Sequence, residues 1–197
     1  MNIDYLQLLL LTVFALVITA RYTVSLKRGV RPVLILKRDK SLKVRVIETI
    51  PVVMVALTAL LVLRKIFTPQ IGSALAAGFQ IPIVLQLSGF VLAFLSFILL
   101  IGGYWSLGNN WRVGTGDEEV KELITGGVFA YTRNPVYLFF NLFLLGKFLI
   151  NGDYVILIIF FCVMVSLHLV ILEEEKLLQR RFGQQFNHYK QSTPRYF

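Results

Sequence analysis

Residues 154–172 read YVILIIFFCVMVSLHLVIL, and residues 135–150 read PVYLFFNLFLLGKFLI. An α-helix needs about 20 predominantly apolar residues to cross a hydrocarbon layer ~30 Å thick, so both stretches are candidates for membrane spans. Only Asn151, Gly152 and Asp153 separate them, and a connection this short joins antiparallel neighbours. The sequence therefore predicts a helical hairpin in a membrane. At 1.5 Å per residue its first helix is roughly 24 Å long, shorter than the hydrocarbon layer.

Apolar residues dominate the rest of the chain as well. Of its 197 residues 56% are hydrophobic and 16% are charged, whereas ordinary soluble domains have ~25% charged residues. This composition excludes an ordinary soluble domain, a disordered chain, a collagen and a coiled coil. Hydropathy predicts an all-α integral membrane protein with five transmembrane helices, at residues 3–20, 46–63, 81–105, 135–150 and 154–172.

The positive charges divide unevenly between the connecting segments. Of the 20 Lys and Arg residues, nine lie between residues 21 and 45, three between 106 and 134, and five after Leu172. Because Lys and Arg are enriched in short cytoplasmic loops, these segments are predicted to face the cytoplasm. The amino terminus is then outside and the carboxyl terminus inside the cytoplasmic membrane. Lys147, near the outer end of the fourth span, is expected to extend its ammonium group to the interface.

Few side chains are suited to metal or redox chemistry. Cys162 is the single cysteine and lies in an apolar stretch, so neither an intrachain disulfide nor a thiolate cluster is possible. His168 and His188 are the only histidines, and we expect no metal site. The net charge of +9 is attributed to topology and to contact with anionic headgroups, so the expected partners are membrane lipids and not nucleic acid.

The start of the fourth span is the first candidate site. Asn134 is a good N-cap and Pro135 a good first helical residue, and a helix start by itself needs no function. The free N–H groups and partial positive charge of such a start, beside the planar guanidinium of Arg133, would also suit an anionic ligand. Upstream, Gly126 and Gly127 form either a turn or a close backbone approach to that ligand.

Three acids, residues 173–175, end the fifth span. In one interpretation the helix simply continues into water, with Lys176 and Gln179 as pairing partners and Gly183 as the C-terminal cap. In the other interpretation the hairpin brings these carboxylates next to the start of the fourth helix, opposite Arg133.

His168 is an ionisable residue within an apolar span, which makes it a functional candidate. At 100° per residue, Glu175 lies within about 20° of the same helix face, whereas Glu174 lies about 120° away. A hydrogen-bonded structural histidine is the alternative, and the sequence leaves both open.

Taken together, these segments resemble the isoprenylcysteine carboxyl methyltransferase family, which is related to the phospholipid N-methyltransferases. The resemblance is carried by LITGGVFAYTRNPVY at residues 123–137, by EEKLL at 174–178, and by Phe182-Gly183, Tyr189 and Pro194-Arg195. The chain looks like a prokaryotic-type member. The resemblance implies an integral membrane enzyme that uses S-adenosyl-L-methionine, with residues 1–104 as a three-span scaffold and residues 105–197 as the cofactor-binding catalytic region.

The resemblance also assigns the site, residue by residue. Arg133 and Glu174 take the catalytic roles, Arg133 holding anionic groups and Glu174 the polar groups of the cofactor. The residues implied to bind S-adenosyl-L-methionine are Lys121, Glu122, Leu123, Ile124, Gly127, Phe129, Asn134, Pro135, Tyr137 and Glu174.

The methyl acceptor is implied to be a lipophilic molecule that enters from the membrane. This chain has Asn134 where the family commonly has a histidine, and Val170 where the eukaryotic enzymes have a substrate-binding arginine. A carboxylate is nucleophilic at neutral pH, whereas an amine must first lose a proton to a base. Methyl esterification of a carboxylate such as an isoprenylcysteine is therefore favoured, and N-methylation of a phospholipid or another amine stays open because His168 could supply a base.

Two other functions share parts of the pattern. Sterol-type reductases that use NADPH have a similar Arg-x-Pro-x-Tyr ending, although the doubled glutamate argues against them. A lipid-binding membrane protein without catalysis is the remaining alternative.

Overall fold

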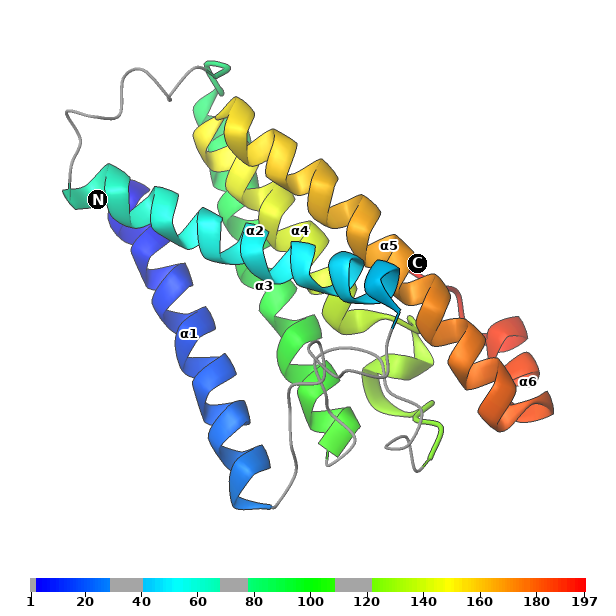
Figure 1. Cartoon of the computed structure of the whole chain (residues 1–197). Coiled ribbons are helices and arrows are strands. Elements are labelled where there is room, and N and C mark those ends of the chain that lie inside the picture. The colour runs from blue at the N-terminus through cyan, green and yellow to red at the C-terminus, as the bar shows by residue number, and fades with distance from the viewer. Residues whose placement is uncertain (1–2, 29–40, 68–77, 109–121) are drawn as a thin grey trace.

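A computed structural model describes residues 3–28, 41–67, 78–108 and 122–197, and all its elements are helices (Figure 1). Apart from an isolated bridge between Gly78 and Asp153, the described residues form no β-structure, and the all-α prediction is confirmed. The elements are α1 (Ile3–Lys27), α2 (Leu42–Phe67), α3 (Ile83–Leu107), the short 3-10 helix η4 (Gly127–Ala130), α4 (Pro135–Asn151), α5 (Tyr154–Phe182) and α6 (Gln184–Ser192).

Four of these helices are long and apolar enough to cross a membrane, namely α1, α2, α3 and α5. The helix α4 is apolar but shorter, as its sequence predicts. Several helices extend beyond their predicted spans. The clearest case is α5, in which the charged residues after Leu172 stay helical as far as Phe182. An integral membrane protein is supported, and the side of the membrane that each end faces stays a prediction.

The predicted hairpin of α4 and α5 is present. Gly152 ends α4 with a φ of 73°, a left-handed conformation that glycine adopts without strain. A Cβ on Gly152 would lie 2.2 Å from the carbonyl oxygen of Phe79, whose N–H donates to the Gly152 oxygen at 2.9 Å. The turn therefore needs glycine both for its backbone conformation and for the close approach of the segment that precedes α3.

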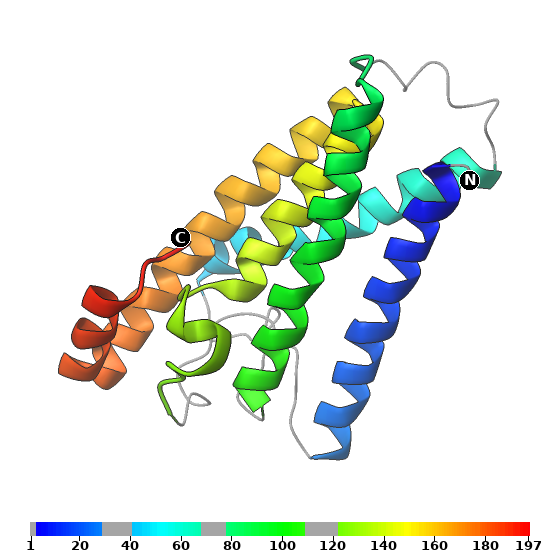
Figure 2. The ribbon, with the colours of Figure 1, turned by 180° about the vertical axis from the view of Figure 1, so that it is seen from behind.

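The helices α3 and α4 lie side by side in both views of the ribbon (Figure 2). Their contact is made by small residues, since a Cβ on Gly146 would lie 2.5 Å from the Gly89 oxygen and 2.9 Å from the Ala93 Cβ. Small residues let helix backbones approach closely in lipid, where packing rather than hydrophobic burial holds helices together.

The Gly146→Ala variant is expected to lose about 1–3 kcal/mol of stability, because the added methyl group meets backbone atoms that cannot move aside. The measurement is the thermal unfolding midpoint in detergent micelles. Gly126→Ala is the matched control, since a Cβ there meets nothing within 4 Å and φ is −94°. Equal melting of the two variants would contradict this packing.

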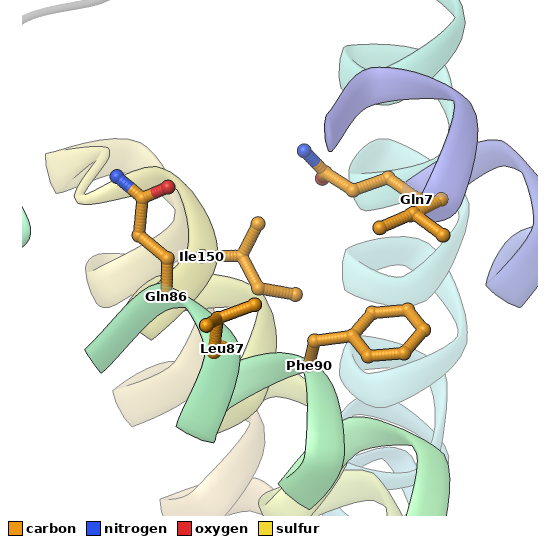
Figure 3. A pocket seen from close by; sticks show the side chains of 6 residues that line it. Gln7, Gln86, Leu87, Phe90 and Ile150 are labelled. Carbon is orange, nitrogen blue, oxygen red and sulfur yellow. The ribbon is translucent and has the colours of Figure 1, made fainter. Parts of the chain in front are cut away.

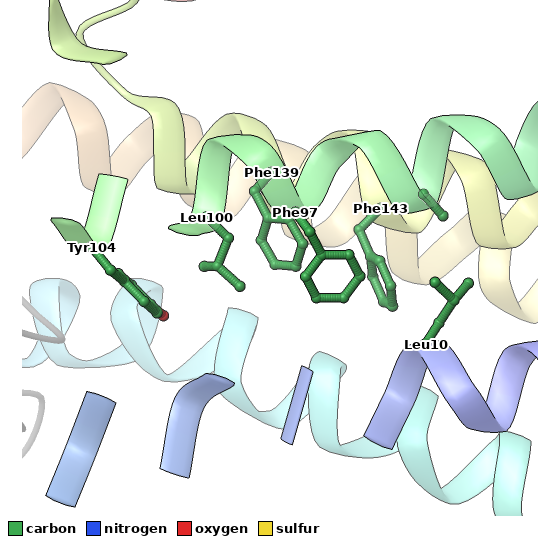
Figure 4. Close-up of a cluster of buried hydrophobic side chains, with 7 residues drawn as sticks. Leu10, Phe97, Leu100, Tyr104, Phe139 and Phe143 are labelled. Carbon is green, nitrogen blue, oxygen red and sulfur yellow. The ribbon is translucent and has the colours of Figure 1, made fainter. Parts of the chain in front are cut away.

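A cluster of buried side chains joins α1 to this helix pair (Figure 4). Its rings stack and tilt against one another, with Phe97 and Phe139 centroids 5.3 Å apart and Phe14 and Phe139 centroids 5.8 Å apart. The buried members are Leu10, Ala93, Phe97, Leu100, Tyr104, Phe139 and Phe143.

The helix α2 packs against α5 and, at its far end, against α1 (Figures 1 and 2). Ser166 of α5 donates a hydrogen bond of 2.6 Å to the Ile47 carbonyl, so the first half of α2 is fixed to the hairpin. A second buried cluster lies at the junction of α2, α4 and α5. It contains Leu144 of α4 and Leu167 of α5, and Met54 and Leu61 of α2 pack against it. This place is called the α2–α4–α5 junction below.

The prediction that Lys147 extends to the interface is wrong. Lys147 is 2% exposed, and its ammonium group donates to the Oε1 atom of Gln7 in α1. The side chains of Gln7 and Asn151 also exchange two hydrogen bonds of 2.9 Å. Because α1 brings a polar partner to it, Lys147 stays inside the bundle and joins α1 to the hairpin.

Beside this polar contact is a small hollow between α1, α3 and α4 (Figure 3). Gln7, Gln86, Leu87, Phe90 and Ile150 line it together with Leu6. It lies where α4 ends, whereas the predicted site residues lie where α4 begins, so this hollow is not part of the candidate site.

Candidate active site

The last turns of α3 support the segment that leads into α4. A Cβ on Gly102 would lie 2.6 Å from the Val128 side chain, and one on Gly103 would lie 2.7 Å from that of Val136. These two glycines therefore let η4 and the first turn of α4 pack directly onto α3. The start of α4 is held at the end of the bundle where α5 carries its acidic residues.

Asn134 and Pro135 begin α4 as predicted, with Pro135 in the first turn. The Asn134 side chain makes no capping bond and is 8% exposed. Its Nδ2 atom donates to the Arg195 carbonyl at 3.1 Å, and Thr132 donates to the same carbonyl at 3.2 Å. The Asn134 amide, which was predicted to cap the helix, therefore binds the carboxyl-terminal segment instead.

Arg133, which was predicted to suit an anionic ligand, forms hydrogen bonds with other residues of the chain. Its Nη2 atom donates to Glu175 at 2.8 Å, and its Nη1 atom donates to the carbonyls of Thr193 at 2.7 Å and Lys190 at 3.3 Å. Its backbone N–H donates to the Pro194 carbonyl at 3.0 Å. With 10% of its side chain exposed, Arg133 fastens the carboxyl-terminal segment to the start of α4.

We call residues 190–196 the C-terminal strap. Arg195 of the strap binds both carboxylate oxygens of Glu175, at 3.0 Å and 2.7 Å, in a bidentate pair. This hydrogen bonding raises the pKa of the Arg195 guanidinium above its usual value. Glu175 thus lies between two arginines, one from the helix start and one from the strap.

His168 also binds the strap. Its Nδ1 atom lies 2.7 Å from the Tyr196 hydroxyl. Glu175 and His168 therefore share a helix face, as their spacing predicts, and that face is covered by Arg195 and Tyr196. The contact gives His168 a structural partner, which supports the alternative of a hydrogen-bonded histidine.

Upstream of the strap, Tyr189 of α6 donates to the Phe129 carbonyl of η4 at 2.6 Å. Burial raises the pKa of Tyr189 to about 12, and the nearby Arg133 lowers it by a smaller amount. The phenol therefore keeps its proton, and its hydrogen bond, well above neutral pH. Sequence reasoning found Tyr189 only as part of a resemblance, because nothing local shows that it reaches η4.

The three consecutive acids have three different partners. Glu173 pairs with Lys176 at 3.0 Å on the exposed side of α5, and Glu175 binds the two arginines. Glu174 accepts a hydrogen bond of 2.6 Å from the hydroxyl of Tyr137, which lies in the first turn of α4. Successive helical residues point 100° apart, so one acid faces water, one faces the strap and one faces the α2–α4–α5 junction.

Sequence reasoning missed Glu48 of α2. It is 5% exposed, and its charge acts on the Tyr137 hydroxyl. Glu48 therefore adds a second carboxylate near the Tyr137–Glu174 pair, from the part of the chain that was predicted to be only a scaffold. The signal was present in the sequence, since an acid inside an apolar span is costly and is usually functional.

The remaining predicted site residues lie in η4, in the segment just before it, or outside the described residues. Glu122 is exposed, and Leu123 and Ile124 are half-buried in the segment before η4. Gly127, in η4, has a φ of 62° that favours glycine, whereas Phe129 is 9% exposed. Lys121 lies outside the described residues. Within the described part of the chain, no three His, Cys, Asp or Glu side chains come together as metal ligands.

The fold and this site define a class, a helical membrane protein with a hairpin whose paired acid and phenol lie at the start of a short span. The sequence model of the phospholipid methyltransferase family matches residues 84–185, from α3 to the beginning of α6. The match covers more than half of the chain, and the chain belongs to this family. A search of curated proteins finds no match.

Family membership confirms the coarser part of the sequence interpretation, a membrane methyltransferase. The matched region begins at residue 84, before the residues that carry the predicted resemblance, and so includes nearly all of α3. The close packing of α3 on η4 and on the start of α4 gives a physical reason for including α3 in the match, because α3 supports the site.

Proposed function

We propose that the chain transfers a methyl group from S-adenosyl-L-methionine to a lipophilic acceptor in the membrane, at the end of the bundle where α4 begins. The observation that supports this most directly is the Tyr137–Glu174 pair. It places an acid and a phenol at the α2–α4–α5 junction of a chain in the phospholipid methyltransferase family. The cytoplasmic orientation of this end follows from the charge distribution and belongs to the proposal.

The residues at this end fit the proposed cofactor by the chemistry of their groups. S-adenosyl-L-methionine carries an ammonium group and ribose hydroxyls, all of which donate hydrogen bonds. Glu174 supplies a carboxylate acceptor that Tyr137 holds in place, and Phe129 with Leu123 and Ile124 supplies apolar surface for a base. Glu122, Gly127, Asn134 and Pro135 complete the proposed binding segment, and Lys121 would precede it.

When bound, S-adenosyl-L-methionine supplies an electrophilic methyl group for an in-line displacement. The chain then has to hold its groups in line with the acceptor and exclude water, and orientation of this kind can lower a barrier by ~7–11 kcal/mol. We assign Glu174 to direct contact with the cofactor. We assign Arg133 to positioning, because its guanidinium binds Glu175 and the strap carbonyls and so fixes the start of α4.

The acceptor belongs to one of two classes. The sequence favours a carboxylate such as that of an isoprenylcysteine. The presence of two carboxylates near the Tyr137 hydroxyl, Glu174 and the buried Glu48, favours an amine lipid as the second candidate, since carboxylates in a poorly solvated junction repel an anionic group.

Titration of the purified chain in detergent with S-adenosylhomocysteine and with NADPH tests the proposal. We expect saturable binding of S-adenosylhomocysteine and no binding of NADPH, followed by transfer of labelled methyl groups to one acceptor class. Binding of NADPH alone would identify a reductase. Saturation with lipid and no binding of either nucleoside would identify a lipid-binding protein without catalysis.

A further inference from the structure

Asn141 is a polar side chain inside α4 that the proposed reaction does not yet use. It follows Tyr137 by four residues and precedes Leu144 by three, so the three side chains follow one face of the helix. Leu144 belongs to the buried cluster with Leu167 of α5, and Tyr137 packs against this cluster together with Met54 of α2. Asn141 therefore lies at the α2–α4–α5 junction, one turn deeper in the membrane span than Tyr137.

The Oδ1 atom of Asn141 is buried and accepts no hydrogen bond from any described residue. A carbonyl oxygen without a donor is costly in an apolar environment, and buried polar atoms are nearly always paired. Asn151, at the other end of the same helix, shows the usual arrangement of a paired amide. The amide of Asn151 binds Gln7 through both its oxygen and its nitrogen, and also the Lys147 carbonyl.

The Tyr137–Glu174 pair, one turn from Asn141 along α4, includes a carboxylate acceptor. Glu174 accepts from Tyr137, and Glu48 brings another carboxylate toward the same hydroxyl. The Asn141 oxygen adds an acceptor without a donor among the described residues to a region that water enters poorly. A ligand group that pairs with this oxygen has to donate a hydrogen bond.

We propose that Asn141 is a specificity-determining residue whose amide oxygen accepts a hydrogen bond from the headgroup of the methyl acceptor. The inference rests on the proposed function. It assigns to the acceptor a headgroup with an N–H or O–H donor, which an amine lipid and the amide of a prenylated cysteine derivative both supply. Such a donor would satisfy the oxygen that the apo chain leaves without a partner.

The test compares Asn141→Leu with Asn151→Leu in purified full-length protein. Removing an unpaired buried oxygen is expected to raise the thermal unfolding midpoint, whereas removing the paired amide of Asn151 is expected to lower it. If Asn141 were merely structural, its replacement would also lower the midpoint, and that result would overturn the proposal. Asn141→Leu is expected to bind S-adenosylhomocysteine as tightly as the wild type, because the oxygen serves the acceptor and not the cofactor.

Three probes then identify the donor by their effect on the unfolding midpoint: dioleoylphosphatidylethanolamine, N-acetyl-S-farnesylcysteine and dioleoylphosphatidylcholine, which has no N–H. We expect one of the first two to stabilise the wild type and to bind Asn141→Leu about tenfold more weakly. Stabilisation by phosphatidylcholine to the same extent, an unchanged response of Asn141→Leu, or no response of the wild type to either donor would overturn it. Binding of S-adenosylhomocysteine to the wild type is independent of these outcomes, so failure here leaves the proposed function standing.

Discussion

The Glu175→Ala variant is expected to melt roughly 4–12 °C below the wild type. Glu175 is 14% exposed and is the carboxylate partner of Arg133 and Arg195, which would both lose it. Breaking a buried ion pair costs about 3–5 kcal/mol and an exposed pair about 1 kcal/mol or less. Because Arg195 is one-third exposed, we expect a loss of about 2–3 kcal/mol, and each kcal/mol lowers the midpoint by ~2–4 °C at this chain length.

The strap should also come free of the bundle in this variant. The Arg133 guanidinium would keep its bonds to the carbonyls of Thr193 and Lys190, and Arg195 would lose both of its bonds to the carboxylate. Limited proteolysis, followed by mass spectrometry of the carboxyl terminus, measures this release. Glu173→Ala is the matched control, since its partner Lys176 is exposed and the pair adds little stability. Equal melting of the two variants would show that the arginine cluster does not hold the strap.

The Glu174→Ala variant is expected to fold and to bind S-adenosylhomocysteine about 10- to 150-fold more weakly. Hydrogen bonds to a charged group contribute ~1.5–3 kcal/mol, and each 1.4 kcal/mol is a factor of ten in affinity. The substitution also leaves the Tyr137 hydroxyl without the carboxylate that accepts its hydrogen bond. Isothermal titration with S-adenosylhomocysteine measures the affinity, and methyl transfer should decline with it.

Alanine variants of the three neighbouring acids should thus separate effects on stability from effects on the affinity for S-adenosylhomocysteine. Glu173→Ala should change neither, Glu175→Ala should mainly lower stability, and Glu174→Ala should mainly lower affinity. Alanine at each position leaves helix propensity equal across the series. An unchanged dissociation constant in Glu174→Ala would remove this residue from the cofactor site, whatever its melting temperature.

Much of this arrangement could be read from local sequence. The short connection at residues 151–153 predicted the hairpin, and the hairpin then predicted that the acids of α5 would lie near the start of α4. The separate directions of Glu174 and Glu175 follow from the helical period. These inferences succeeded because each depends on a few residues close together in the chain and on the fixed geometry of a helix.

The partners of Arg133 and Lys147 could not be read in this way. A free guanidinium beside a helix start and one already bound by Glu175 and the strap have the same local sequence. A lysine near the end of a span extends to the interface unless another helix brings it a partner, as Gln7 of α1 does here. In both cases the deciding group lies far away in the chain.

The sequence by itself determined an all-helical membrane protein, a short fourth span and a doubled acid at the end of the fifth, because composition and periodicity are properties of single segments. Only the tertiary structure decided which acid meets Tyr137, that the carboxyl terminus closes over Arg133, and that the buried Glu48 of α2 lies near the Tyr137–Glu174 pair. The physical reason is that a polar group buried in lipid must find its partner in space, and which helix supplies that partner depends on how the whole bundle packs.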